Sequence, residues 1–390
     1  MGAISFACML LVFMLSFQFG SYDTMIDFAV GAYTGFLQVQ ARGYQTKQEI
    51  RLTIPDPAAV GQMLEAIPEV RHCTFRSRAF ALVSSPERTH GALVIGVDPA
   101  REEKVSTIRR LLRRGRYLSP DETGGALAGE ILARNLRVGI GDELVLLGQG
   151  GDGSVAATTV RVRGIFRTGQ DDFDRSTLEI PLRDFDDVFS MNGGVHEVVV
   201  VGHRLDPVTA LKRSVTAGLR RIDPAGRLVA MDWQELMPGL VEGITIDLTS
   251  GMIFYLILVV VVSFSILNTF LMAVLERTRE FGVMMALGTA PRRLIRILML
   301  ESVLMTVLGL AAGVLLGVAV TAFFQARGIV FSDTSGLLQQ FGLPDRLYPR
   351  LSLLSLTIGP ALVFGITVVT ALFPALRVQR LRVVEAITHA

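Results

Sequence analysis

The sequence predicts an α-helical membrane protein with four transmembrane helices and a large α+β extracytoplasmic domain inserted between helices 1 and 2. Three observations predict this fold class: four uncharged apolar runs, a long segment of mixed strand and helix pattern after the first run, and arginines beside the later runs. Half of the 390 residues are hydrophobic and the formal net charge is only +2. Bulk charge therefore gives no indication of nucleic-acid binding.

The four runs lie at residues 1–22, 254–275, 302–324 and 351–373, and none contains a charged side chain. Each has the roughly 20 residues that a helix needs to cross a bilayer. The first could be a signal peptide, but its missing basic start and long apolar run favour a retained helix. We expect helix 1 at 1–22, the extracytoplasmic domain (two subdomains) at 23–242, a stalk and helix 2 at 243–275, a cytoplasmic coupling helix at 276–293, helix 3 at 294–324, an extracytoplasmic loop at 325–350, helix 4 at 351–373 and a cytoplasmic tail at 374–390.

Arginine positions predict the orientation, because cytoplasmic loops carry an excess of basic residues. Such residues cluster between the second and third runs and after the fourth: Arg277, Arg279, Arg292, Arg293, Arg296, Arg377, Arg380 and Arg382. The loop at 325–350 fits less well, since Arg327, Arg346 and Arg350 flank it. We therefore expect both clusters in the cytoplasm and the segment 23–242 outside it.

The long segment alternates between strand and helix patterns. Strands are expected at 36–41, 79–84, 92–97, 143–147, 159–166, 178–182 and 195–201. Asp56 before Pro57 and Asp206 before Pro207 are typical helix starts, so helices are expected at 57–66 and 207–219. Subdomain borders are expected near Ser119 and Val201, with a return helix running to Glu242.

Motifs for catalysis are missing from the chain. The five histidines are scattered, Cys8 and Cys73 are not expected to pair, and no G-x-S-x-G or Walker A pattern occurs. Gly148, Gly150 and Gly153 match G-x-G-x-x-G, but a strand pattern follows where a dinucleotide site needs a helix, so a hairpin tip is expected. We expect no metal, no cofactor and no enzymatic activity, and any ATP must bind another chain.

The segment from Glu276 to Gly288 lies between two apolar runs and has the pattern of a short amphipathic helix. Oppositely charged residues stand three apart, Phe281 and the following methionines form an apolar stripe, and Gly288 can end the helix before Thr289 and Pro291 start the next. An interfacial helix and a coupling helix docked in a groove of an ATPase both fit this pattern. The residues assigned to coupling are Glu276, Arg277, Thr278, Arg279, Glu280, Phe281, Met284, Met285, Leu287 and Gly288.

The third and fourth runs contain residues that predict close helix packing. Gly309, Gly313 and Gly317 form a G-x-x-x-G-x-x-x-G ridge, although glycine is also generally frequent in membrane helices. Glu301 needs a partner at a membrane edge, and Arg296 or Arg293 is expected to supply it. Gly359 and Pro360 predict a kink in the fourth run.

Three stretches resemble a known family. ERTREFGVMMALGTAPRRLIRILMLESVLMTVLGLAAGVLLG resembles the FtsX-type permease domain of ABC transporters, in the group of MacB and LolC/LolE. The end PALRVQRLRVVEAITHA is similar to its closing pattern through Pro374, Ala375, Arg380, Glu385 and Ala386. GIFRTGQDDFDRSTLEIPL is similar to the membrane-distal domain of lipoprotein-releasing permeases, and Trp233 stands where the family often has a tryptophan. Relatives usually carry a basic amphipathic segment before the first run, whereas Met1 here opens directly into it.

The resemblance implies a bacterial inner-membrane permease with a periplasmic domain. It implies as partners a cytoplasmic ABC ATPase, a second permease copy or paralogue, the lipid bilayer, and a lipoprotein cargo or periplasmic protein. Such subunits turn ATP hydrolysis into movement of the periplasmic domains, which is called mechanotransmission. Release of lipoproteins or other amphiphiles is the expected function. Two alternatives remain open: drug or peptide efflux with a periplasmic adaptor, and FtsX-like activation of a cell-wall hydrolase, against which the large domain argues.

Overall fold

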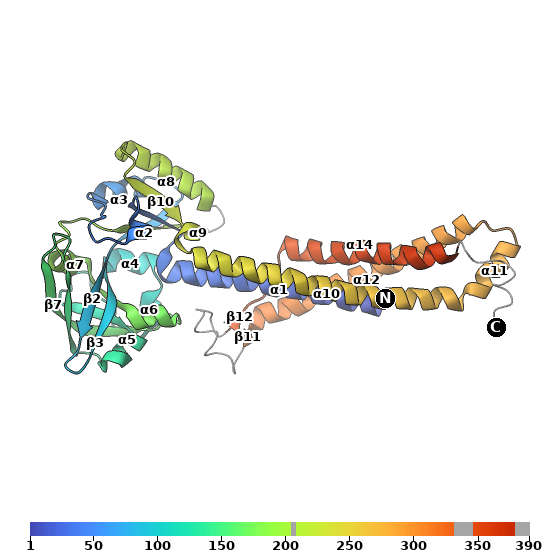
Figure 1. Ribbon diagram of the computed structural model, residues 1–390, viewed down its shortest axis with the longest axis horizontal. Coiled ribbons are helices and arrows are strands. Elements are labelled where there is room, and N and C mark those ends of the chain that lie inside the picture. Colours follow the sequence, from blue (N-terminus) through green and yellow to red (C-terminus); the bar gives the residue numbers. More distant parts are fainter. Residues whose placement is uncertain (204–207, 331–345, 379–390) are drawn as a thin grey trace. The chain divides into compact units, whose positions relative to one another are not determined.

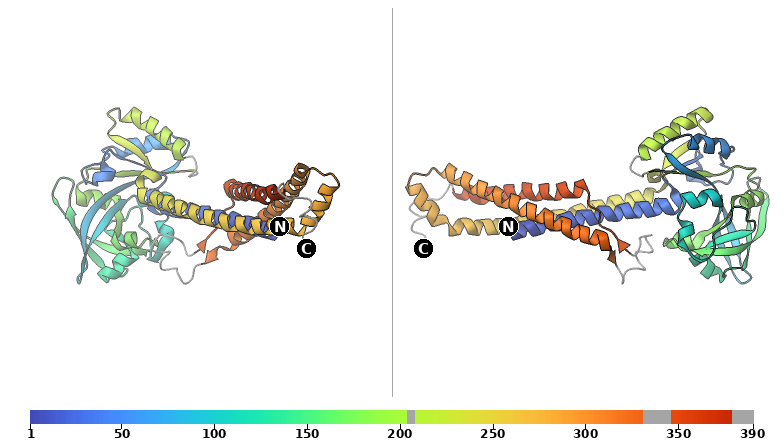
Figure 2. Two further views of the ribbon diagram at one scale, coloured as in Figure 1. Left: turned by 45° about the vertical axis from the view of Figure 1, so that its right-hand side comes forward. Right: turned by 180° about the vertical axis from the view of Figure 1, so that it is seen from behind.

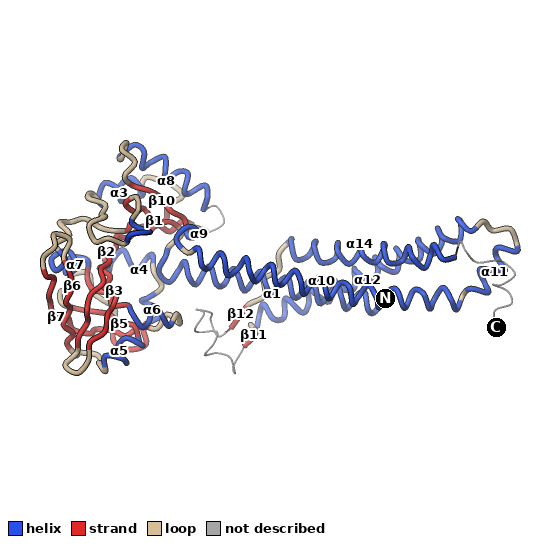
Figure 3. Tube along the Cα trace, viewed as in Figure 1, coloured by secondary structure: helices blue, strands red, loops and turns tan. Residues whose placement is uncertain are grey.

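The computed structural model describes residues 1–203, 208–330 and 346–378, which form two compact units (Figure 1). Among the described residues, the helical unit comprises 1–24, 242–330 and 346–378, and the sheet unit comprises 25–241. All strands between residues 37 and 232 belong to the sheet unit, and Figure 3 draws them in red. Each unit is described by itself.

Four long helices make up the helical unit, and each is apolar enough over a sufficient length to cross a membrane. The elements are α1 (Gly2–Ala29), α10 (Pro238–Glu276), α11 (Thr278–Ala286), α12 (Pro291–Arg327), the short pair β11 (Ile329–Val330) and β12 (Arg346–Leu347), and α14 (Leu353–Val378). All four long helices extend beyond the expected apolar runs. The backbone of α14 stays helical through Gly359 and Pro360.

Helix α1 contacts the other three long helices. Its Ile4 and Leu11 share an apolar cluster with Ile266 of α10 and Val363 of α14. Figure 2 shows α1 and α10 side by side from two further directions. A polar contact joins α1 to α12, since the Ser5 hydroxyl donates to the Gly309 carbonyl at 2.9 Å. Most other apolar side chains of this unit point outward, as expected of helices in lipid.

The sheet unit contains a ten-stranded mixed sheet, counted over the described residues. The strand order is β10-β1-β9-β2-β3-β8-β5-β7-β4, and β6 pairs with both β2 and β7. The pairing therefore closes into a ring, β2-β3-β8-β5-β7-β6. The strands are β1 (Leu37–Ala41), β2 (Val70–Ser84), β3 (Thr89–Val97), β4 (Leu112–Gly115), β5 (Gly125–Gly129), β6 (Glu143–Gln149), β7 (Val155–Phe166), β8 (Thr177–Pro181), β9 (Glu197–Gly202) and β10 (Leu228–Asp232).

Short helices cover the sheet and connect its strands. They are η1 (Val30–Thr34), α2 (Tyr44–Lys47), α3 (Pro57–Glu65), α4 (Pro99–Val105), η2 (Ile108–Leu111), α5 (Glu130–Leu136), α6 (Asp171–Ser176), α7 (Leu182–Phe189), α8 (Val208–Ile222) and α9 (Trp233–Leu236). α3 begins as the sequence predicts, because the Asp56 carboxylate accepts from the Ala59 amide at 2.9 Å. The expected start at Asp206 and Pro207 lies outside the described residues.

The two largest hydrophobic cores of the sheet unit share one long strand. The first fills the ring and includes Val94, Leu146 and Phe185. The second lies between α3, α8 and the strands β1, β9 and β2. Residues 70–76 of β2 pair with β9, whereas residues 81–84 pair with β6. The predicted subdomain border near Ser119 is therefore wrong. The two halves of the sheet unit meet within β2, which belongs to both of them.

Every predicted strand is present, most with longer bounds. The glycine-rich segment is a hairpin tip between β6 and β7, as predicted. The Gly150 amide donates to the Ser154 carbonyl at 2.9 Å, and Gly153 has a φ of +93°, which favours glycine. The sequence did not predict β4, β5 or β10. Those strands are four or five residues long, and β5 (GALAG) is made of small residues with weak strand preference.

Candidate functional site

The predicted coupling segment forms helix α11 and the turns on either side of it. The helix ends as predicted, because Gly288 has a φ of +92° and the Thr289 amide donates to the Met284 carbonyl at 3.0 Å. Helix α12 then starts at Pro291, with Ala290 rather than Thr289 at its N-cap. The result is a nine-residue helix between two long apolar ones.

The apolar stripe of α11 faces its own chain. Phe281 is 4% exposed and packs against Val274, Leu294 and Leu298, with both methionines, Met284 and Met285, against the same cluster. The sequence had placed these three side chains in the groove of a partner. That placement is wrong for Phe281, because the stripe closes the turn between α10 and α12.

Other residues make the exposed face of α11. Leu287 is 82% exposed and Val283 is 46% exposed, and the side chains of Arg279 and Glu280 also reach solvent. Glu276, Arg277 and Gly288 are exposed at the two ends, while Thr278 is buried and bonds the Val274 carbonyl at 3.0 Å. Charged and apolar groups thus lie together on one short, accessible helix.

Glu301 has a different partner from the one expected. Its carboxylate pairs with the Arg277 guanidinium at 3.1 Å, so the assignment to Arg296 or Arg293 is corrected. The sequence favoured those arginines because they lie within two turns or so of Glu301 on the same helix. Arg277 also contacts Glu280 at 3.5 Å, the predicted pair three residues apart. Arg277 therefore joins the end of α10 to both α11 and α12.

The glycine ridge of α12 lies against α1. A Cβ at Gly309 would stand 3.0 Å from Ile4, one at Gly313 would stand 2.6 Å from the Cβ of Cys8, and one at Gly317 would stand 3.0 Å from Val12. A methyl group at Gly313 would force the neighbouring helix to shift, and one at Gly309 or Gly317 would fit only tightly. The two helix backbones approach closely because these positions carry no side chain.

A buried polar cluster in the sheet unit holds the residues that follow α1. Arg76 of β2 is fully buried and forms an ion pair with the equally buried Glu102 of α4. It also donates to the Tyr33 carbonyl in η1, and its guanidinium lies 4.2 Å from the Tyr33 ring centre. Burial lowers the pKa of Arg76, but the raising effect of Glu102 and the other acidic neighbours is larger. The pKa is therefore raised overall and the group stays charged.

Two more buried titratable groups lie in the sheet unit. His196 accepts from the Arg78 amide through Nδ1 at 3.0 Å and lies 2.9 Å from the Ile50 carbonyl through Nε2. Burial lowers its pKa, which keeps the ring neutral. Glu179 of β8 is fully buried, and both of its carboxylate oxygens lack a hydrogen-bond partner. Burial raises the pKa of Glu179 to about 8, with the nearby Glu102 adding to the effect.

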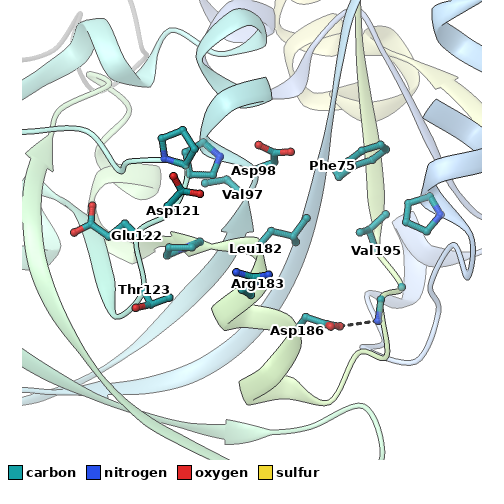
Figure 4. Close-up of a pocket in the computed structure, with 16 residues that line it drawn as sticks. Phe75, Val97, Asp98, Asp121, Glu122, Thr123, Leu182, Arg183, Asp186 and Val195 are labelled. Atoms are coloured by element: carbon teal, nitrogen blue, oxygen red, sulfur yellow. Dashed lines mark hydrogen bonds between the residues drawn. The ribbon is translucent and has the colours of Figure 1, made fainter. Parts of the chain in front are cut away.

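A cavity of about 430 Å³ opens in the sheet unit (Figure 4). Carboxylates and prolines line it, and three of its four carboxylates are bonded to the surrounding chain. Asp98 caps α4, Glu122 is paired with two arginines, and Asp186 accepts from the Gly193 amide at 2.8 Å. These three acidic side chains therefore hold the surrounding chain in place.

The sequence analysis missed the cluster at Arg76 because arginine ordinarily marks an exposed position. One signal was available: Arg76 and Arg78 alternate with the small residues Ser77 and Ala79 along β2, which is a strand pattern. Only the position of Glu102 in space shows that the charge is compensated.

Comparisons with known proteins agree with this architecture. Residues 1–217 match the family described as the MacB-like periplasmic core domain, and residues 252–382 match the FtsX-like permease C-terminal domain. A "lipoprotein-releasing system transmembrane protein LolC" of Xylella fastidiosa is 25% identical over 97% of this chain and 89% of its own length. A "pyoverdine export ATP-binding/permease protein" of Pseudomonas syringae is 38% identical, over 18% of this chain and 10% of its own length.

Among solved structures, the periplasmic region of MacB from Actinobacillus actinomycetemcomitans is similar at 13% identity. It covers 56% of this chain and 97% of its own length, with a TM-score of 0.41. The first match includes α1 and most of the sheet unit, and the second includes most of α10 and the helices that follow it. The chain therefore belongs to the ABC transporter permeases of the FtsX, MacB and LolC family.

Proposed function

We propose that this chain is the permease subunit of an inner-membrane transporter that turns ATP hydrolysis by a partner ATPase into movement of its own periplasmic domain. The work done is the extraction or release of lipoproteins or other amphiphiles from the membrane. The sheet unit, inserted in the chain between α1 and α10, is that domain. A second copy of the chain or a paralogue completes the transporter.

The exposed face of α11 is the observation that carries this proposal. A nine-residue helix that leaves Leu287 82% exposed and Glu280 in solvent has an accessible apolar side chain beside a charge. Such a surface suits insertion into a groove of a cytoplasmic protein. The positive-inside rule supports a cytoplasmic position for this turn, because arginines lie in α11 and on both sides of it: Arg277, Arg279, Arg292 and Arg293.

The lipoprotein assignment is supported by how much of the chain aligns. The relative named as part of a lipoprotein-releasing system matches 97% of this chain. The export protein has the higher identity but matches only 18%. Export with a periplasmic adaptor is therefore the second candidate. Depletion of the chain separates the two, because lipoproteins accumulate in the inner membrane under the first and sort normally under the second.

The coupling test uses exposed positions of this turn and of the helix that follows it. Leu287→Ala and Glu280→Ala, in a complex co-purified with the ATPase, should reduce ATPase stimulation at least about ten-fold, as loss of a central contact residue does. Leu300→Ala, at a position 72% exposed on α12, is the matched control and should behave as wild type. Wild-type stimulation in both α11 variants would refute docking through this face.

A further inference from the structure

Four polar side chains join α1 to α10 within the helical unit. Tyr22 of α1 donates its hydroxyl to the Asp247 carboxylate of α10. Gln18 of α1 donates to the Tyr22 hydroxyl at 2.8 Å and to the same carboxylate at 3.3 Å. Tyr255 of α10 completes the set by donating to the Gln18 side-chain oxygen at 2.6 Å. These four residues are called the α1–α10 polar lock.

The spacing of these residues explains why they meet. Gln18 and Tyr22 are four apart, and so share one face of α1. Asp247, Gly251 and Tyr255 are also four apart along α10, so they form one face as well. A Cβ at Gly251 would stand only 2.8 Å from the Gln18 amide nitrogen. Because Gly251 has no side chain, α10 can approach Gln18, which contacts the other three residues of the polar lock.

The polar lock fixes the axial position of α10 relative to α1. Apolar side chains on neighbouring helices can exchange partners at small cost when one helix slides, because one methyl group is much like another. The hydrogen bonds of Asp247 cannot be exchanged in this way. A slide of one helical turn, about 5.4 Å, would break every bond between the two helices in the set. The lock thus selects a single axial register.

The opposite side of α1 is held by separate contacts. The Ser16 hydroxyl lies 3.0 Å from the Ser355 hydroxyl of α14, and the Asp23 carboxylate pairs with Arg350 at 2.9 Å. A Cβ at Gly20 would stand 2.4 Å from the Tyr348 carbonyl. These contacts bind α1 to α14 and the segment before it, and they do not involve α10. The register of α10 on α1 at this level therefore depends on the polar lock.

We propose that Gln18, Tyr22, Asp247 and Tyr255 are positioning residues that lock α1 and α10 in one axial register, so that the two helices transmit movement as a single rod. The proposal rests on the proposed function, in which movement at α11 must reach the sheet unit. Along the chain, α10 joins the sheet unit to α11, and α1 leads into the sheet unit from its other end. If the two helices slid past each other, movement of one would be lost before it reached the sheet.

The first experiment measures register directly and does not need transport activity. Spin labels at Met14→Cys and Ile253→Cys, exposed positions on α1 and α10, report their separation in the intact chain in lipid nanodiscs, with Cys8→Ala and Cys73→Ala as background. Wild type should give one narrow distance distribution. Each interhelical hydrogen bond lost should raise the population of molecules with a shifted distance about three-fold. Tyr22→Phe loses one such bond and should give about this rise, whereas Asp247→Leu loses two and should give a rise of about nine-fold.

Thr249→Val is the matched control, because Thr249 lies on the same stretch of α10 and its hydroxyl bonds the Thr245 carbonyl of its own helix at 2.8 Å. The control should keep the wild-type distribution. A wild-type distribution in Asp247→Leu would overturn the lock. Shifted distances in the control as well as in Asp247→Leu would overturn it too, since any polar loss on α10 would then suffice.

The second experiment measures cargo released per ATP hydrolysed by the complete transporter. Asp247→Leu should keep the KM for ATP and the hydrolysis rate but release less cargo per ATP, and Asp247→Asn, which retains an acceptor oxygen, should restore part of the yield. Wild-type yield in Asp247→Leu despite altered distances would overturn the positioning role. A wild-type complex that releases no cargo would refute the proposed function instead, while the distance measurements would still decide the lock.

Discussion

Glu179→Gln should stabilise the sheet unit at neutral pH, although it replaces a natural core residue. Glu179 lies on β8 between β3 and β5, with Ile95 opposite it on one side and Leu127 on the other. Neither carboxylate oxygen has a hydrogen-bond partner, and burial raises the pKa from 4.5 to about 8. The folded state therefore holds a proton that the unfolded state releases at neutral pH.

The magnitude follows from the two pKa values. Below pH 4.5 both states keep the proton and stability is unaffected. As the pH rises above this value the unfolded state loses its proton first, so the free energy of unfolding falls by about 1.4 kcal/mol per pH unit until about pH 8. At pH 7, about 2.5 pH units above the unfolded pKa, the loss is about 3 kcal/mol. A glutamine amide has no such proton equilibrium, so Glu179→Gln should recover about this amount at pH 7 and almost nothing near the unfolded pKa.

Trp233 provides the assay. It is the single tryptophan of the chain, and its side chain is buried in the sheet unit against Val30 and Val208. Its fluorescence during urea unfolding of the intact chain in detergent therefore reports on this unit, at pH 5, 6, 7 and 8. Glu87→Gln is the control, because the Glu87 side chain is 65% exposed and pairs with the exposed Arg137. Any pH dependence of stability that comes from His196 cancels when variants are compared, because every variant retains this residue.

The reasoning would be refuted by parallel stability curves. If Glu179→Gln and wild type differ by the same amount at pH 5 and pH 8, the Glu179 carboxyl does not hold an extra proton in the folded state. A loss of stability in the variant at pH 7 would have the same meaning. The control should follow wild type throughout.

Two further predictions concern packing and the buried ion pair. Gly313→Val should disrupt the contact of α12 with α1, because its Cβ would stand 2.6 Å from that of Cys8, and the folded yield in detergent should fall several-fold; Gly365→Val, where nothing lies within 4 Å, should have wild-type yield. Glu102→Gln should lower the free energy of unfolding, measured by urea titration, by about 3–5 kcal/mol, since it leaves the buried Arg76 without its counter-ion. Glu65→Gln, which breaks the exposed pair with Arg101, should cost under about 1 kcal/mol.

Features set by local patterns could be predicted from the sequence. Apolar length alone locates the four long helices, and alternation locates most strands. The Asp56 cap and the hairpin at Gly153 also follow from chemistry within a few residues. The family resemblance supplied the rest of the architecture, and the comparisons agree with it.

Features set by contacts across the chain could not be predicted. Arg277 reaches Glu301 only because α11 folds α10 and α12 back on each other, whereas sequence distance favoured Arg296. Phe281 has the spacing of a docking stripe, and the same spacing serves the internal turn that it fills. The shared strand β2 was missed because its middle third carries two arginines, and their counter-charges come from Glu102 and Glu197.

Strand β2 is fifteen residues long and is hydrogen-bonded to β9 at one end and to β6 at the other. The two halves of the sheet unit are therefore joined by a continuous strand. Arg76, near the middle of that strand, is bonded to the Tyr33 carbonyl of η1. A displacement of η1 would therefore act on both cores together. We therefore expect the two halves of the sheet unit to move together as one rigid body.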